Sequence, residues 1–188
     1  MKAWLVALKA NAKKLNEAIW AWAAERLGQD ERLRNKLFRY AASFPYEPLP
    51  GYMKRWWLVR PTRITWLRRL QPFTVRFHWI EREDRDPHCH DHPWAFRTLI
   101  LHGWYTEELM SNDGSISSKN RIAGDSYRRE LGQFHRISRV SPGGVLTLVI
   151  IGKKRDSWGF KVEDARIDWR SYPGVDAVDT PDKPLKHL

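Results

Sequence analysis

A chain of 188 residues, 42% of them hydrophobic and 11 of them tryptophan, has enough apolar material for one folded domain, which excludes wholesale disorder. Its single cysteine, Cys89, excludes an intramolecular disulfide and suits a reducing compartment. No apolar run is as long as a transmembrane helix, and lysines interrupt the region where a signal peptide would need a clean apolar stretch, so we expect a cytoplasmic protein.

The net charge of +11 is confined to one part of the chain. Residues 1–76 hold 16 Lys and Arg against 5 Asp and Glu, whereas the remaining residues hold 17 of each. Such an excess suits an anionic partner, and nucleic acid bound through residues 1–76 is one candidate. A solvated helical face is the alternative, since no nucleic-acid-binding motif accompanies the charge.

Two helices are the first predicted elements. Residues 2–27 are rich in alanine, lack proline and carry apolar side chains at helical spacing, and a second helix is predicted from residue 29 to about residue 40. A basic helix with tryptophans can lie on a membrane surface, but we prefer packing onto the same domain or onto a partner subunit in a homodimer. The prediction is a helical N-terminal region over residues 1–44, followed by a Pro- and Gly-rich linker over residues 45–54.

From residue 55 to residue 172 short runs of β-branched and aromatic residues alternate with turn signals. The predicted strands cover residues 74–80, 96–101, 103–107, 136–140 and 145–151. Residues 112–115 (Asn-Asp-Gly-Ser) predict a hairpin tip followed by a polar loop. This pattern predicts an all-β sandwich or barrel, and the Pro- and Asp-rich residues 173–188 predict an irregular tail.

Histidines are concentrated in one segment, since six of the seven lie between residues 78 and 135. His88, His90 and His92 occupy alternate positions, so an extended backbone would place them on one face. Two imidazoles on one face can bind one metal ion, with a third ligand supplied from elsewhere in the fold. Cys89 would point to the opposite face. Asp91 would also point away from the histidines, and we expect it to have a structural role.

Two motifs resemble those of the cupin superfamily, G-x5-H-x-H-x3–4-E-x6-G and G-x5-P-x-G-x2-H-x3-N. The corresponding residues here are His90-x-His92-x3-Phe96-x6-Gly103 and Gly124-x5-Glu130-x-Gly132-x2-His135-x3-Arg139. The resemblance covers roughly residues 73–160. A longer pattern, which begins at His-Asp-His-Pro-Trp (residues 90–94) and ends at Trp-Gly-Phe (residues 158–160), is similar to small cupin-like proteins of bacteria and phages. It implies an all-β fold, a cupin-type double-stranded β-helix or jelly-roll barrel, preceded here by the α-helical N-terminal region.

The resemblance also implies a metal site with His90, His92 and His135 as ligands, and His88 is the alternative ligand. Three neutral imidazoles suit a divalent transition metal, with Fe(II) first and Zn, Ni or Mn as alternatives. Phe96 replaces the family's glutamate, which leaves a three-histidine set similar to that of thiol dioxygenases. Glu107 is a further, disfavoured source of a carboxylate ligand.

Several other residues near the motifs are candidates for supporting roles. His78 and His102 could hydrogen-bond to the ligands or act as acid–base groups. Arg76 and Arg97 lie in predicted strands and are candidates to bind an anionic group of a substrate. Aromatic side chains near the motifs fill the barrel in the first instance, and two of them are also candidates for substrate contact, Trp94 and Phe96.

The leading functional hypothesis is a metal-dependent cupin enzyme, specifically a mononuclear non-haem Fe(II) oxygenase acting on an anionic small molecule or a nucleotide-like substrate. One alternative is an isomerase, lyase or hydrolase that uses the metal as a Lewis acid. The other is a non-catalytic cupin module that binds a ligand or nucleic acid. Iron content with oxygen consumption would separate the first hypothesis from the other two.

Overall fold

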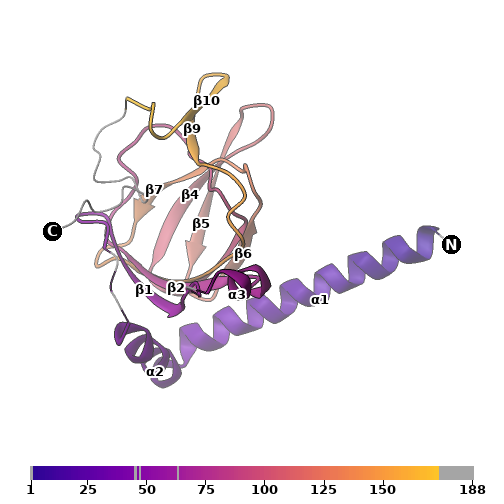
Figure 1. Ribbon diagram of the computed structural model, residues 1–188, viewed down its shortest axis with the longest axis vertical. Helices are drawn as coiled ribbons and strands as arrows, with labels where there is room; N and C mark the ends of the chain where they lie inside the picture. The colour runs from indigo at the N-terminus through magenta and orange to yellow at the C-terminus, as the bar shows by residue number, and fades with distance from the viewer. Residues whose placement is uncertain (1, 45, 47, 63, 174–188) are drawn as a thin grey trace.

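The computed structural model describes residues 2–44, 46, 48–62 and 64–173 (Figure 1). The helices are α1 (Lys2–Gln29), α2 (Glu31–Ala42) and α3 (Thr65–Leu70). The strands are β1 (Met53–Val59), β2 (Thr74–Ile80), β3 (Phe96–His102), β4 (Trp104–Met110), β5 (Ile116–Ile122), β6 (Ser126–Arg129), β7 (His135–Val140), β8 (Val145–Ile151), β9 (Gly159–Val162) and β10 (Ala165–Asp168). No helix in these ranges combines the length and hydropathy needed to cross a bilayer.

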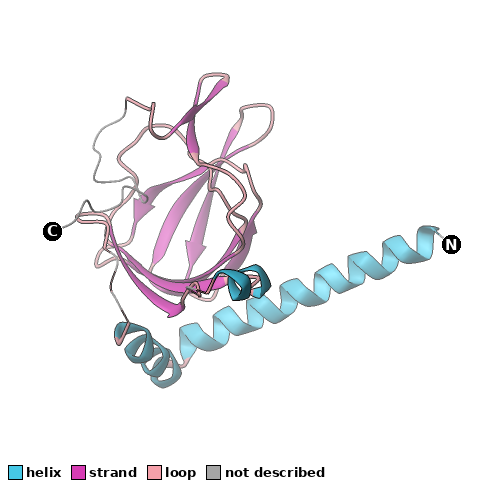
Figure 2. Ribbon diagram, in the orientation of Figure 1, coloured by secondary structure: helices cyan, strands magenta, loops and turns pink. Residues whose placement is uncertain are grey.

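The strands form two antiparallel sheets that curve around a common interior, with a separate β9–β10 hairpin (Figure 2). The strand orders are β1-β2-β8-β3-β6 and β5-β4-β7, and the backbone at His90 bridges to His135 on the free edge of β7. From β2 onward the chain therefore visits the two sheets in the order of a double-sheet jelly roll. This is the cupin-type barrel that the motifs implied, and the prediction of an all-β fold with an N-terminal helical region is confirmed.

Alternate residues of the five-stranded sheet face two different cores, because side chains along a strand point to opposite faces. On β3, Phe96 and Thr98 line the barrel interior, whereas Leu99 packs against the helices on the outside. Ala24 of α1 and Ala41 of α2 are fully buried in this outer core. The N-terminal helices therefore cover one face of the barrel, and the interior is left for the histidines.

Helix α2 begins at Glu31, two residues after the predicted start, because the Asp30 side chain accepts a hydrogen bond of 2.9 Å from the Leu33 amide and caps the helix. Strand β1, however, begins at Met53, inside the stretch predicted as a linker. Leu49 and Tyr52 just before it are buried in the barrel core, and Gly51 has a positive φ of 72° that allows the tight turn between them. The turn at Pro50 therefore leads directly into an ordered strand, which overlaps the predicted linker by two residues.

The hairpin tip predicted at residues 112–115 is present between β4 and β5, but the polar loop expected after it is a strand. All residues of β5 except Arg121 are exposed, and β5 forms an edge of its sheet. A strand with solvent on most of its surface needs no apolar alternation, so its sequence resembles a loop. Most of the predicted irregular tail, residues 174–188, lies outside the described residues.

Candidate metal centre

Residues 81–95, which connect β2 to β3, carry two histidines of the first motif and are held in place by backbone pairing on both sides. The His90 and His135 backbones exchange two hydrogen bonds of 2.9 Å, and the Asp91 amide donates to the Gly159 carbonyl at 3.0 Å. The buried Asp91 carboxylate also accepts a hydrogen bond from the Gly159 amide and pairs with Arg166 at 2.7 Å. The segment therefore lies between β7 and the β9–β10 hairpin, and Asp91 has the structural role that its position in the sequence suggested.

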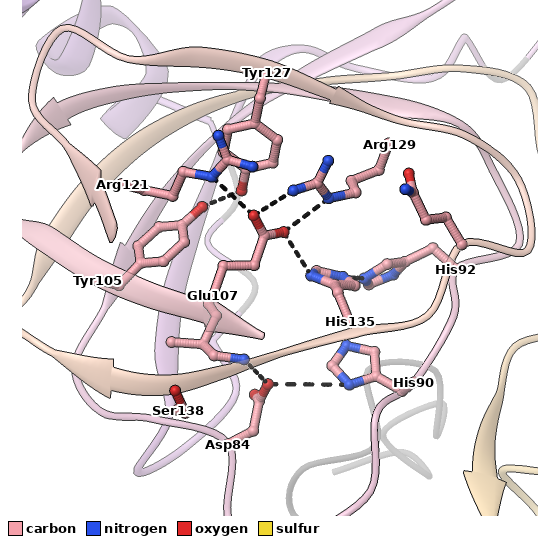
Figure 3. A network of polar contacts seen from close by, with 12 residues as sticks. Asp84, His90, His92, Tyr105, Glu107, Arg121, Tyr127, Arg129, His135 and Ser138 are labelled. Carbon is pink, nitrogen blue, oxygen red and sulfur yellow. Dashed lines mark hydrogen bonds and ion pairs between the residues drawn. The ribbon is translucent and has the colours of Figure 1, made fainter. Parts of the chain in front are cut away.

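His90, His92 and His135 converge, and we call these three residues the histidine cluster (Figure 3). One candidate ligand atom from each lies within 4.8 Å of the others. The Nε2 atoms of His92 and His135 are 3.0 Å apart. This separation is close to that of two nitrogen ligands sharing one first-row ion at bond lengths of about 2.0–2.1 Å.

Glu107 lies behind His135 and not in the cluster (Figure 3). The Glu107 side chain is fully buried, and its Oε1 accepts a hydrogen bond of 3.0 Å from His135 Nδ1. An ionised carboxylate can only accept, so this bond places the ring proton on Nδ1 and leaves the Nε2 lone pair of His135 facing the cluster. Glu107 thus orients the His135 ring, which differs from the ligand role considered for Glu107 from the sequence.

Two arginines keep Glu107 ionised. Arg121 donates to its carboxylate at 2.9 Å and Arg129 at 2.8 Å. Burial alone would raise the pKa of Glu107, but the hydrogen bond from His135 and the hydrogen bond and charge of Arg129 outweigh burial and lower this pKa to about 2. The negative charge behind His135 is therefore retained throughout the neutral range.

Asp84 is the corresponding carboxylate near His90, with Oδ2 at 4.0 Å from His90 Nδ1. Its carboxylate also accepts from the Ile137 amide at 2.7 Å and from the Tyr52 hydroxyl at 2.5 Å. Burial lowers the pKa of His90 to about 4 and lowers the pKa of His92 well below its ordinary range. Both imidazoles are therefore neutral at physiological pH, which is the form that binds metals.

A cavity of about 140 Å³ lies inside the barrel, and the histidine cluster forms part of its wall. Large aromatic side chains surround the cluster, with ring centroids of Phe96 and His92 4.9 Å apart and those of His90 and Trp158 6.1 Å apart. Strands β1 and β2 contribute Arg55, Arg76 and His78 to the same cavity. Neutral nitrogen ligands, carboxylates behind them and an apolar surround fit a divalent first-row metal ion.

The structure brings four of the other candidate residues to this cavity. Phe96 and Trp94 both line it, and the Trp94 ring stacks near His92 at a centroid distance of 6.4 Å. His78 and Arg76 project inward from β2, and the Arg76 guanidinium lies 3.7 Å over the Trp57 ring. The structure thus brings these four residues to the cavity of the cluster, and their roles there stay predictions.

Three candidates lie elsewhere. Arg97 points outward to α1, where it pairs with Glu17 at 2.9 Å, because it alternates with the inward-facing residues of β3. His102 is exposed, since a β-bulge between Ile100 and His102 shifts the register and turns it out of the barrel. His88 lies outside the cluster, because the chain bends at residues 85–88 and its Nδ1 is hydrogen-bonded to the Tyr172 hydroxyl at 2.8 Å.

Sequence reasoning missed several residues of the site. Asp84 and Trp158 had no distinguishing spacing, and Phe160 belongs to a hairpin that the sequence did not predict. Glu107 could have been weighted more heavily, because it is a charged residue at an inward position of a predicted strand, flanked by Thr106 and Glu108. A carboxylate at such a position requires a charged partner.

Neither a protein-family model nor a curated protein matches the chain. Among solved structures, oxalate decarboxylase from Bacillus subtilis at pH 4.6 is similar over 69% of this chain and 31% of that enzyme, with 11% identity and a TM-score of 0.49. A structure of the same enzyme studied for its Mn(II) centres has a TM-score of 0.47 over the same shares, and a deletion variant has 13% identity and a TM-score of 0.48. The chain thus spans less than a third of that enzyme's length, and no residue role is carried over from this similarity.

Proposed function

We propose that the protein is a mononuclear metal-dependent oxygenase that acts on a small anionic molecule inside the barrel. The observation that carries the proposal is the histidine cluster, three imidazoles without a carboxylate among them, in the wall of the barrel cavity. Nitrogen-only sites of this kind suit Fe(II) among the metals available to such an enzyme, with Zn, Ni and Mn as alternatives.

A bound Fe(II) would supply sites for oxygen and substrate side by side, and the chain's own residues perform the other tasks. The His135 ring is held in one tautomer by Glu107, and His90 lies beside the Asp84 carboxylate. Trp94 and Phe96 exclude water from the cluster's surroundings. The ligand geometry is therefore arranged before any substrate enters.

Substrate contacts are proposed for polar groups in the same cavity. Arg55 and Arg76 place positive charge there, which favours an anionic substrate. Within the described residues, His78 Nε2 and Trp158 Nε1 are buried without a hydrogen-bond partner. Buried polar atoms are rarely left unpaired, so we assign these two to contacts with substrate atoms. Burial and the charges of Arg55 and Arg76 lower the pKa of His78 well below its ordinary range, so its ring is neutral and can form a hydrogen bond with the substrate without carrying a charge.

Cavity size limits the substrate. A volume of about 140 Å³ is close to that of cavities known to enclose a benzene molecule. A small carboxylate fits within it, whereas a whole nucleotide would have to remain largely outside. The proposal is therefore restricted to small organic anions, which narrows the substrate range considered from the sequence.

Metal analysis of protein purified without an affinity tag, under anaerobic conditions, is the first test. We expect one iron per chain and oxygen consumption that depends on an added small carboxylic acid from a screened panel. The His135→Ala variant should lose both while keeping its circular dichroism spectrum. Retention of zinc or nickel with no oxygen consumption would refute the oxygenase proposal in favour of Lewis-acid chemistry, and a metal-free native protein that binds no added metal would refute both.

A further inference from the structure

Helix α1 is longer than the part of it that contacts the barrel. At 1.5 Å per residue its 28 residues span about 42 Å. Its C-terminal half packs against β3 and β6, with Trp20, Ala24 and Leu27 in the outer core. The N-terminal half extends beyond the barrel (Figure 1). Half of this helix therefore has no packing partner among the described elements.

A row of large apolar side chains follows the exposed side of α1, and we call it the α1 stripe. Its members are Trp4 (66% exposed), Leu8 (52%), Leu15 (64%), Ile19 (53%) and Trp22 (66%). At 100° per residue these positions fall within a sector of about 60°, on the side of the helix away from Trp20 and Ala24. The stripe thus faces outward, where the protein's own barrel cannot cover it.

The spacing of the stripe is that of a helix-pairing seam. Trp4, Leu8, Leu15 and Trp22 are separated by four, seven and seven residues, which corresponds to the a and d positions of a heptad repeat. The seam is flanked by small residues, Ala7, Ala12 and Ala21, which permit close approach of a second helix. Two central positions remain, Asn11 and Ala18, and a single polar residue such as Asn11 can fix the register of a helix pair.

The exposed area of the stripe matches what a dimer requires. With about 250 Å² for a whole tryptophan and about 180 Å² for Leu or Ile, the exposed fractions correspond to about 600 Å² per chain. Two copies would bury about 1,200 Å², which is the lower end of specific, stable interfaces.

The side chains on the opposite side of α1 favour a second protein copy over a membrane as the partner of the stripe. Lys9 and Lys13 lie on the side of the helix away from the stripe, and Lys14 lies beside Ala7 and Ala18 at its margin. Val6, which is 67% exposed, lies on the same side as these lysines, so α1 lacks the uniformly polar opposite face of a helix that lies in a bilayer interface. A paired helix keeps these lysines of the two copies apart.

We propose that the protein forms a homodimer in which the α1 stripes of two copies pack against each other. This interface is independent of the histidine cluster, and the proposal does not rest on the proposed function. Because α1 is anchored to the outside of the barrel, pairing through its far side leaves both cavities unobstructed.

Sedimentation velocity of the full chain over a range of micromolar concentrations tests this proposal. We expect a dimer for the wild type and a monomer for the double variant Leu8→Glu, Leu15→Glu, with self-association weakened more than tenfold. Val6→Glu is the matched control, because Val6 is 67% exposed on the same helix but lies off the stripe. The control should remain a dimer, and circular dichroism should show the same helix content in all three proteins.

Two results would overturn the proposal. One is a wild-type protein that stays monomeric, and co-sedimentation of that monomer with phosphatidylglycerol vesicles would then assign the stripe to a lipid surface. The other is a double variant that remains dimeric with the wild-type association constant, which would place the interface on a different surface.

Discussion

Replacing Glu107 with Gln should destabilise the fold and weaken metal binding together, because the same carboxylate neutralises two buried arginines and orients His135. The substitution keeps the size of the side chain and one acceptor oxygen, and it removes the charge. Arg121 and Arg129 would then lie buried without their counter-ion. Removing one charge from a buried ion pair costs about 3–5 kcal/mol.

The pKa of Glu107 gives a second measure of the same energy. A fall from 4.5 in the unfolded chain to about 2 in the folded protein corresponds to about 3 kcal/mol of stabilisation by the ionised form. Because the folded pKa is the lower one, this stabilisation is complete above pH about 4.5 and is lost as the pH falls toward 2. The difference between wild type and Glu107→Gln should therefore shrink over that range.

Urea unfolding of the metal-free proteins at neutral pH, followed by tryptophan fluorescence, measures the stability term. Calorimetric titration with zinc or anaerobic Fe(II) measures metal affinity. We expect a 10- to 100-fold loss of this affinity, which is typical when a partner of a ligating histidine is removed. Glu108→Gln is the matched control. Glu108 is the next residue of β4, but it pairs with Arg136 at a partly exposed position, so its loss should cost less than about 1 kcal/mol.

The reasoning would be refuted if Glu107→Gln unfolded at the same urea concentration as the wild type and bound metal with the same affinity. Loss of stability with unchanged metal affinity would refute only the orienting role. In that case the His135 tautomer would have to be fixed by something other than its hydrogen bond to Glu107.

Single Ala substitutions in the histidine cluster should each remove the metal while circular dichroism stays unchanged, whereas His88→Ala should retain it; a metal-free His88→Ala protein would contradict the assignment. Phe96→Glu places a carboxylate next to the cluster and should tighten divalent metal binding in a calorimetric titration, and an unchanged affinity in a folded variant would show that position 96 does not reach the metal. Because the pKa of His90 falls from 6.5 to about 4 on folding, the unfolded chain binds the extra proton between these values. The free energy of unfolding of the metal-free protein should therefore decrease as the pH falls from about 6.5 to about 4, and His90→Gln should flatten this dependence in urea titrations at each pH.

The parts of the fold that sequence predicted best are those with a strong local signal. Strands β2 and β8 have the predicted bounds. Strand β8 is an apolar, β-branched run that is buried on both faces, and β2 alternates between buried and partly buried residues. The motif resemblance implied His90, His92 and the distant His135 as a candidate ligand set, and the structure brings these three residues together. In each case the information lies in residues whose neighbours in space are specified by the motif or by the strand period.

The sequence could not predict which side chains point into the barrel, because their direction depends on how strands distant in sequence pair with one another. Arg97 and Arg76 look equivalent in their strands, but one faces Glu17 on the outside and the other faces the cavity, according to which residues of β3 and β2 point inward. A single β-bulge reverses the direction of His102. These directions are set by strand pairing across the barrel, which no local pattern records.

The backbone bridges from His90 to His135 and to Phe160 have a kinetic consequence. They join segments that are distant in sequence, so we expect them to form only after other strand pairs have closed most of the loops of the barrel. A metal ion that needs His90 and His135 together therefore finds its full site late, beyond the transition state for folding. Metal should accordingly slow unfolding while leaving the refolding rate almost unchanged. The ion would then stabilise the folded barrel kinetically without accelerating its folding.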